Sequence, residues 1–178
     1  MITRILLTLS LSLFVGFSAQ AQSRDHLTQQ EVDLVKEAQI LDKRIDVFIR
    51  AAERRLIVIN GSAAANTKPL KKESERWGEL PTGSRTELVS DIARIIDAAI
   101  DNIDDVSLHD ERSPLIAKSL RKLAASANSM MAQLKPLSAQ AKSDAEIASF
   151  EQLNEGVQSI MEAVTKLPPE VEKKAKKN

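Results

Sequence analysis

The chain has 178 residues, in which 25 lysines and arginines balance 25 aspartates and glutamates, and it has no cysteine. A balanced charge gives no reason to expect a nucleic-acid partner. The lack of cysteine excludes disulfides, thiol catalysis and covalent haem attachment. Aromatic residues are scarce, with one tryptophan, four phenylalanines and no tyrosine, which argues against a site that stacks sugars or unpaired bases.

The first 21 residues have the pattern of a secretory signal peptide. Arg4 supplies a positive charge, and residues 5–17 are almost entirely apolar but too few to span a bilayer. Ala19 and Ala21 then provide the small side chains of a cleavage site. We expect cleavage after Ala21 and export to the periplasm or the medium, with no transmembrane segment in the mature chain.

A long first helix is predicted over residues 28–60. It opens with Thr28 and Glu31, which have the spacing of a capping box. Apolar residues then recur at alternating steps of four and three, which places them on one face of a helix. They are Leu34, Ala38, Leu41, Ile45, Phe48 and Ala52. At about 1.5 Å per residue, this uninterrupted helix would measure about 50 Å.

Residues 61–85 are predicted to form a long connection, because they contain three of the glycines and two prolines. Connections of this length are uncommon in compact domains and are usually functional or disordered. Trp77 is the one aromatic residue of the segment. Two interpretations stay open: Trp77 packs the connection onto the bundle, which we favour, or it offers an exposed contact to a partner.

Three further helices are predicted over residues 86–108, 113–136 and 143–167, each with one apolar face. Leu123 and Val157 are expected in the middle of the buried faces of the last two. Four helices that each need to bury one stripe form a four-helix bundle. The expected fold is therefore all-α, an up-down-up-down bundle with a long connection between its first and second helices.

Residues 22–167 are expected to form the bundle domain, and residues 168–178 a flexible, solvated tail rich in lysine. Several residues are predicted to mark helix ends. Ser113 precedes Pro114 at the start of the third helix. Pro136 is expected to stop or kink that helix. Ser143 and Glu146 have the spacing of a second capping box.

An acidic row lies toward the end of the predicted second helix. It consists of Asp97, Asp101, Asp104 and Asp105, and His109 follows it. Like charges four residues apart repel by about 0.2–0.5 kcal/mol, and the C-terminal end of a helix disfavours anions. Three interpretations stay open: a solvated acidic face, which we favour, a site for calcium or magnesium, or compensation by basic groups of this chain or a partner.

A basic repeat occurs on the first helix, where Lys36, Lys43 and Arg50 recur every seven residues with Arg54 and Arg55 nearby. We expect a solvated outer face, and the three repeating residues are the candidates for contact with a partner.

Two stretches of the chain resemble a group of exported helical-bundle proteins of bacteria. In the first helix these are residues 37–39, 42–45 and 52–56, and in the second helix residues 95–105. The resemblance covers about half of the chain. It implies a helical fold and an exported location, and it implies no chemistry.

The sequence carries none of the motifs that commonly mark a catalytic site in such a fold. The sequence has no Glu-x-x-His of paired-metal bundles, no nucleophile elbow and no glycine-rich phosphate loop. The leading hypothesis is an exported, non-enzymatic protein without a cofactor, which binds a protein or another component of the cell envelope. The alternative is a metal-binding protein that uses the acidic end of the second helix.

Overall fold

The computed structural model describes residues 25–61 and 74–169, and this part of the chain is helical with no strand. The helices are α1 Gln29–Glu37, α2 Leu41–Ile59, α4 Arg85–His109, α5 Pro114–Ser138 and α6 Asp144–Thr165. A short helical turn at residues 74–77 precedes α4. The predicted signal peptide and the lysines of the predicted tail lie outside the described residues.

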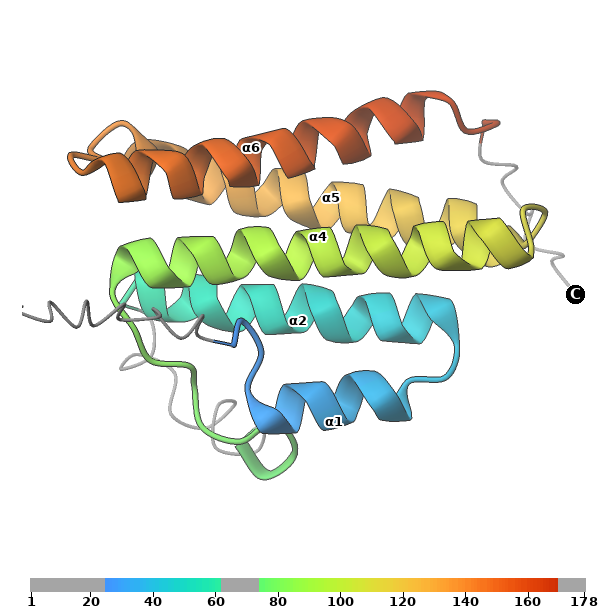
Figure 1. Ribbon diagram of the computed structural model, residues 1–178, viewed down its shortest axis with the longest axis horizontal. Helices are drawn as coiled ribbons and strands as arrows, with labels where there is room; N and C mark the ends of the chain where they lie inside the picture. The colour runs from blue at the N-terminus through green and yellow to red at the C-terminus, as the bar shows by residue number, and fades with distance from the viewer. Residues whose placement is uncertain (1–24, 62–73, 170–178) are drawn as a thin grey trace, which may run out of the picture.

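The four long helices α2, α4, α5 and α6 pack side by side as a bundle, and consecutive helices run in opposite directions (Figure 1). Their order around the bundle is not their order in the chain. Helices α2 and α6 each contact both α4 and α5, and within the described ranges α2 and α6 do not contact each other. In consequence α2 and α5 are parallel neighbours, and so are α4 and α6 (Figure 1).

Polar contacts link both pairs of parallel neighbours. Between α2 and α5, the Lys118 ammonium binds the Asp42 carboxylate. One turn further along the same two helices, Lys122 Nζ lies 2.6 Å from Asp46 Oδ1. Between α4 and α6, the Arg85 guanidinium pairs with Glu146. Each ion pair joins residues in the first half of one helix to residues in the first half of its neighbour. The starts of the two helices therefore lie at the same end of the bundle, as parallel packing requires.

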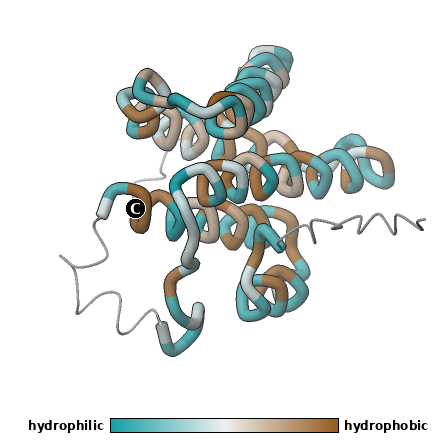
Figure 2. Tube along the Cα trace, turned by 60° about the vertical axis from the view of Figure 1, so that its left-hand side comes forward, coloured by the Kyte–Doolittle hydropathy of each residue, from teal (hydrophilic) through white to brown (hydrophobic). Residues whose placement is uncertain are grey.

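The apolar core lies between the four long helices, and hydrophobic residues follow the sides of the helices that face one another (Figure 2). Leu123 and Val157 are 1% and 6% exposed, so their predicted burial is confirmed. Ile92, Ile95 and Leu153 are completely buried beside them.

The prediction of one helix over residues 28–60 is wrong. The helix breaks at residues 38–40, and α1 folds back along α2 (Figure 1). A straight helix would measure about 50 Å against about 37 Å for the 25 residues of α4, so its first turns would project beyond the bundle. Folding back instead buries Leu34, which is 6% exposed.

Of the two predicted capping boxes, the one at α1 forms completely and the one at α6 forms in part. At α1 the Thr28 N–H donates to the Glu31 carboxylate and the Glu31 N–H donates to the Thr28 hydroxyl, so this capping box is confirmed. At α6 the Ser143 hydroxyl accepts from the Glu146 N–H. The Glu146 carboxylate, however, binds Arg85 and accepts from the Lys142 N–H, one residue before the cap, rather than from the Ser143 N–H, so only half of the second box forms.

The remaining helix ends include one unpredicted cap. Ser84 and Glu87 form a capping box at the start of α4. Pro114 occupies the first turn of α5, as predicted. Pro136 does not stop α5, which continues to Ser138, because a proline in the last turn forfeits only one backbone hydrogen bond.

Candidate functional site

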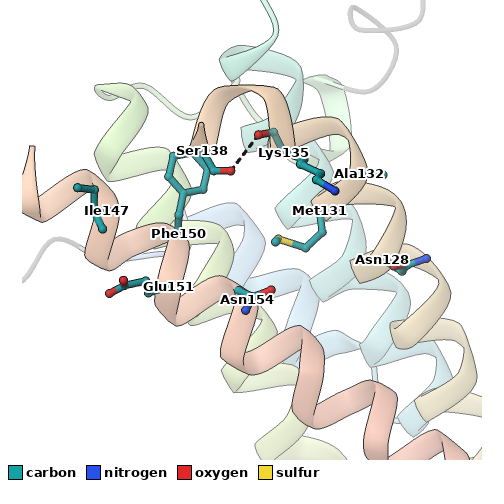
Figure 3. Close-up of a pocket in the computed structure, with 9 residues that line it drawn as sticks. All are labelled: Asn128, Met131, Ala132, Lys135, Ser138, Ile147, Phe150, Glu151 and Asn154. Atoms are coloured by element: carbon teal, nitrogen blue, oxygen red, sulfur yellow. Dashed lines mark hydrogen bonds between the residues drawn. The ribbon is translucent and has the colours of Figure 1, made fainter. Parts of the chain in front are cut away.

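An open groove of about 630 Å³ lies between α5 and α6, close to the turn that joins them (Figure 3). Its lining from α5 is Asn128, Met131, Ala132, Lys135 and Ser138, and from α6 Ile147, Phe150, Glu151 and Asn154. In the last turn of α5, at the end of the groove, the Ser138 hydroxyl donates to the Lys135 carbonyl at 2.9 Å.

The groove combines an apolar floor with a polar rim. Phe150 belongs to the buried core, whereas Ile147 is 40% exposed. Met131 extends from α5 into the space between the two helices, opposite Asn154 of α6 (Figure 3). Methionine side chains adapt their shape to an incoming group, and amides at a rim fix its orientation. The arrangement suits an apolar side chain that arrives flanked by polar groups.

Trp77 and Lys43, two of the residues proposed to contact a partner, line one hollow of about 450 Å³. This hollow lies between α1, α2 and the helical turn at residues 74–77, and Leu34 of α1 also lines it. Trp77 is half-buried against the core, and the Arg54 guanidinium lies 5.7 Å from its ring centroid, a cation–π distance. The indole therefore helps to pack the connection, and its contact with a partner stays a prediction.

The basic repeat does not form one continuous face. Lys36 lies on α1, while Lys43 and Arg50 lie on α2, because the break at residues 38–40 turns α1 back. Each of the three is close to an acid three residues away on its own helix. The pairs are Lys36 with Asp33 at 3.9 Å, Lys43 with Asp46 at 4.0 Å and Arg50 with Glu53 at 2.9 Å.

The acidic row extends along the outer side of α4. Asp97 accepts a hydrogen bond from Gln152 of α6 at 3.1 Å, and His109 Nδ1 lies 2.7 Å from the Asp105 carbonyl oxygen. The exposed members are Asp101, Asp104 and Asp105. Over residues 25–61 and 74–169, no three histidine or acidic side chains gather closely enough to hold a metal ion. The metal site stays a prediction.

A buried charge cluster, which the sequence reasoning missed, joins α1, α2 and α4. Glu31 is completely buried, and Arg54 and Arg55 are each 1% exposed, so the expectation that both arginines lie near a solvated face is wrong. Asp91 of α4, 3% exposed, completes the cluster, with Oδ2 3.9 Å from Arg55 Nε. Buried charges require partners because desolvation is costly.

Glu31 is held from two sides. Its carboxylate accepts a bidentate pair of hydrogen bonds from Arg55, at 2.7 and 2.8 Å. Arg54 Nε lies 3.3 Å from the same carboxylate. The sequence did contain a signal: Arg55 follows Phe48 by seven residues, which places it on the apolar stripe and not opposite it.

Arg54 also fixes the end of the connection that leads to α4. Its Nη2 donates to three successive carbonyls, those of Trp77, Gly78 and Glu79, at 3.2, 3.1 and 2.6 Å. Gly78 has a φ of +68°, and a Cβ at this position would meet the Gln30 side chain at 3.0 Å. A glycine is therefore required where the connection crosses the start of α1.

No helix in the described part of the chain is long and apolar enough to cross a membrane. Comparison with known protein families, curated proteins and solved structures finds no match to the chain.

Proposed function

We propose that this chain is an exported, non-enzymatic binding protein whose α5–α6 groove receives an apolar side chain of a partner protein or another envelope component. The observation that carries the proposal is the 40% exposed Ile147, which lines an open groove that also holds Phe150, Met131 and the amides of Asn128 and Asn154. Covering such a side chain contributes on the order of 1 kcal/mol to binding. Export is supported by the signal-peptide pattern of residues 1–21.

The proposal is tested first by recovering the protein from outside the cytoplasm and measuring its intact mass. The expected mass is that of a chain beginning at Gln22. A mass that retains residues 1–21 would contradict the export proposal.

The groove is tested by capturing envelope components with purified mature protein and with two variants. Ile147→Asp places a charge in the groove, and we expect it to weaken capture at least tenfold. Met161→Asp is the matched control, because Met161 is 41% exposed on the same helix and does not line the groove. Equal capture by both variants would rule out the groove as the binding site.

A further inference from the structure

Helix α2 holds α1 through one apolar residue and two arginines. Val47 is 7% exposed and lines one hollow with Leu34 of α1, and Arg54 and Arg55 bind Glu31 of α1. Glu31 accepts three interactions from the two arginines. A helix without a carboxylate at this position would leave two buried guanidinium groups short of negative charge.

The segment that joins α1 to α2 has none of the usual residues that end a helix. Residues 38–40 include neither glycine nor proline, and Ile40 at the start of α2 provides no side-chain cap and is 55% exposed. The break is held instead by two side chains. Arg44 Nε donates to the Ala38 carbonyl at 2.9 Å, and Gln39 Nε2 donates to the Lys36 carbonyl at 2.6 Å.

Local sequence and tertiary structure disagree at this hinge. The apolar stripe through Leu34, Ala38 and Leu41 continues across the break with the spacing of one uninterrupted helix. A conflict of this kind means that the backbone of residues 38–40 does not by itself favour the bend, which depends on the docking of α1 and on the two side-chain hydrogen bonds at the hinge. A straight hinge would restore the helical hydrogen bonds that the bend interrupts.

We propose that α1 is exchangeable between two copies of this chain. The hinge straightens, residues 28–60 become one helix, and α1 of each copy docks on α2 of the other. Every contact of Glu31 with Arg54 and Arg55 is then remade between chains, so the exchanged dimer keeps the docking energy and gains the continuous helix. Its formation depends on chain concentration, as expected of any association. The proposal concerns a different surface from the α5–α6 groove and does not rest on it.

The test compares the mature chain with two hinge variants by sedimentation over a roughly 100-fold range of concentration, after slow cooling from partial unfolding. Gln39→Ala removes a bond that holds the bend and favours helix, so we expect dimerisation to strengthen roughly tenfold per hinge. Ile40→Pro forbids a straight helix and should weaken dimerisation roughly 100-fold per hinge. In the bent chain Ile40 has a φ of −93° in the extended region, about 30° from the value that proline prefers, so proline requires a small adjustment there.

An exchanged dimer is distinguished from other dimers by two labels on separate chains. The chain lacks cysteine, so dyes can be attached at Asp33→Cys on α1 and at Glu75→Cys beside α2. Because the exchanged α1 remakes its contacts on α2 of the other chain, the efficiency of energy transfer between chains in the dimer should match the efficiency within a monomer that carries both labels. The proposal is overturned if the mature chain and Gln39→Ala both stay monomeric, if Ile40→Pro dimerises as well as the mature chain, or if transfer between chains in the dimer is clearly weaker than transfer within the doubly labelled monomer. Should Ile40→Pro fail to fold, Gln39→Ala and the labels still decide the matter.

Discussion

Replacing Glu31 by alanine is the most direct test of the charge cluster. The change removes the carboxylate that bonds Arg55 bidentately, at 2.7 and 2.8 Å, and leaves two arginines that are each 1% exposed. Breaking a buried ion pair by removing one partner lowers stability by about 3–5 kcal/mol. Within the described residues α1 packs on α2 alone among the helices, so we expect the loss to appear first as undocking of α1.

Two probes separate undocking from global unfolding. Trp77 is the single tryptophan and lines the hollow beside α1, so its fluorescence reports on docking, whereas far-ultraviolet circular dichroism reports on the whole bundle. In urea, the fluorescence transition of Glu31→Ala should precede the dichroism transition. Glu53→Ala is the control. The side chains of Arg50 and Glu53 are 34% and 40% exposed, so their ion pair contributes at most about 1 kcal/mol to the free energy of unfolding. If Glu31→Ala and Glu53→Ala lower the free energy of unfolding by the same amount, the role assigned to Glu31 is refuted.

Three other predictions concern the core, pH and metal ions. Truncating Leu123 or Val157 to alanine should lower the free energy of unfolding by about 2–4 kcal/mol, and losses below about 0.5 kcal/mol at both would contradict their place in the core. Burial, helped by Arg94 and Arg55, lowers the pKa of His26 from 6.5, so the folded chain favours the neutral ring. His26 should therefore not lower the free energy of unfolding above pH 6.5, and should lower it progressively as the pH falls below 6.5. The resulting drop in melting temperature should be smaller in His26→Gln. If the acidic row binds a cation, calcium should raise the melting temperature and Asp101→Asn should reduce the effect; no response to calcium, magnesium or manganese would leave the row as a solvated face.

The last three helices could be predicted from the sequence because their signals are local. Each has one apolar stripe, and α5 and α6 begin at the predicted Pro114 and just after Ser143. The core positions Leu123 and Val157 follow from the same spacing. Such patterns define which face of a helix is buried, but they do not define which helix covers it. The order α2, α4, α6, α5 around the bundle therefore came from the structure alone.

The first helix was mispredicted because its break is determined at long range. Nothing in residues 38–40 ends a helix, and the contacts that favour the bend join Glu31 to an arginine 24 positions later. The α5–α6 groove had no sequence signal for a similar reason. In the sequence Ile147 looks like any other apolar residue of a helix, and only the packing of α6 against α5 shows that it lines an open groove together with Met131.

The two proposed binding surfaces should act independently of each other. Helix α1 packs on α2, whereas the groove lies between α5 and α6 (Figure 1). Helix α2 does contact α5, but no residue of α1 or α2 lines the groove. Ile147→Asp should therefore weaken capture by the groove and leave dimerisation unchanged, while Ile40→Pro should do the reverse. Substitutions at separate sites that share no contacts have additive effects within about 0.5 kcal/mol, so the double variant should show both losses at full size. A loss of capture in Ile40→Pro would instead mean that the partner recognises the dimer, and the two surfaces would then form one site.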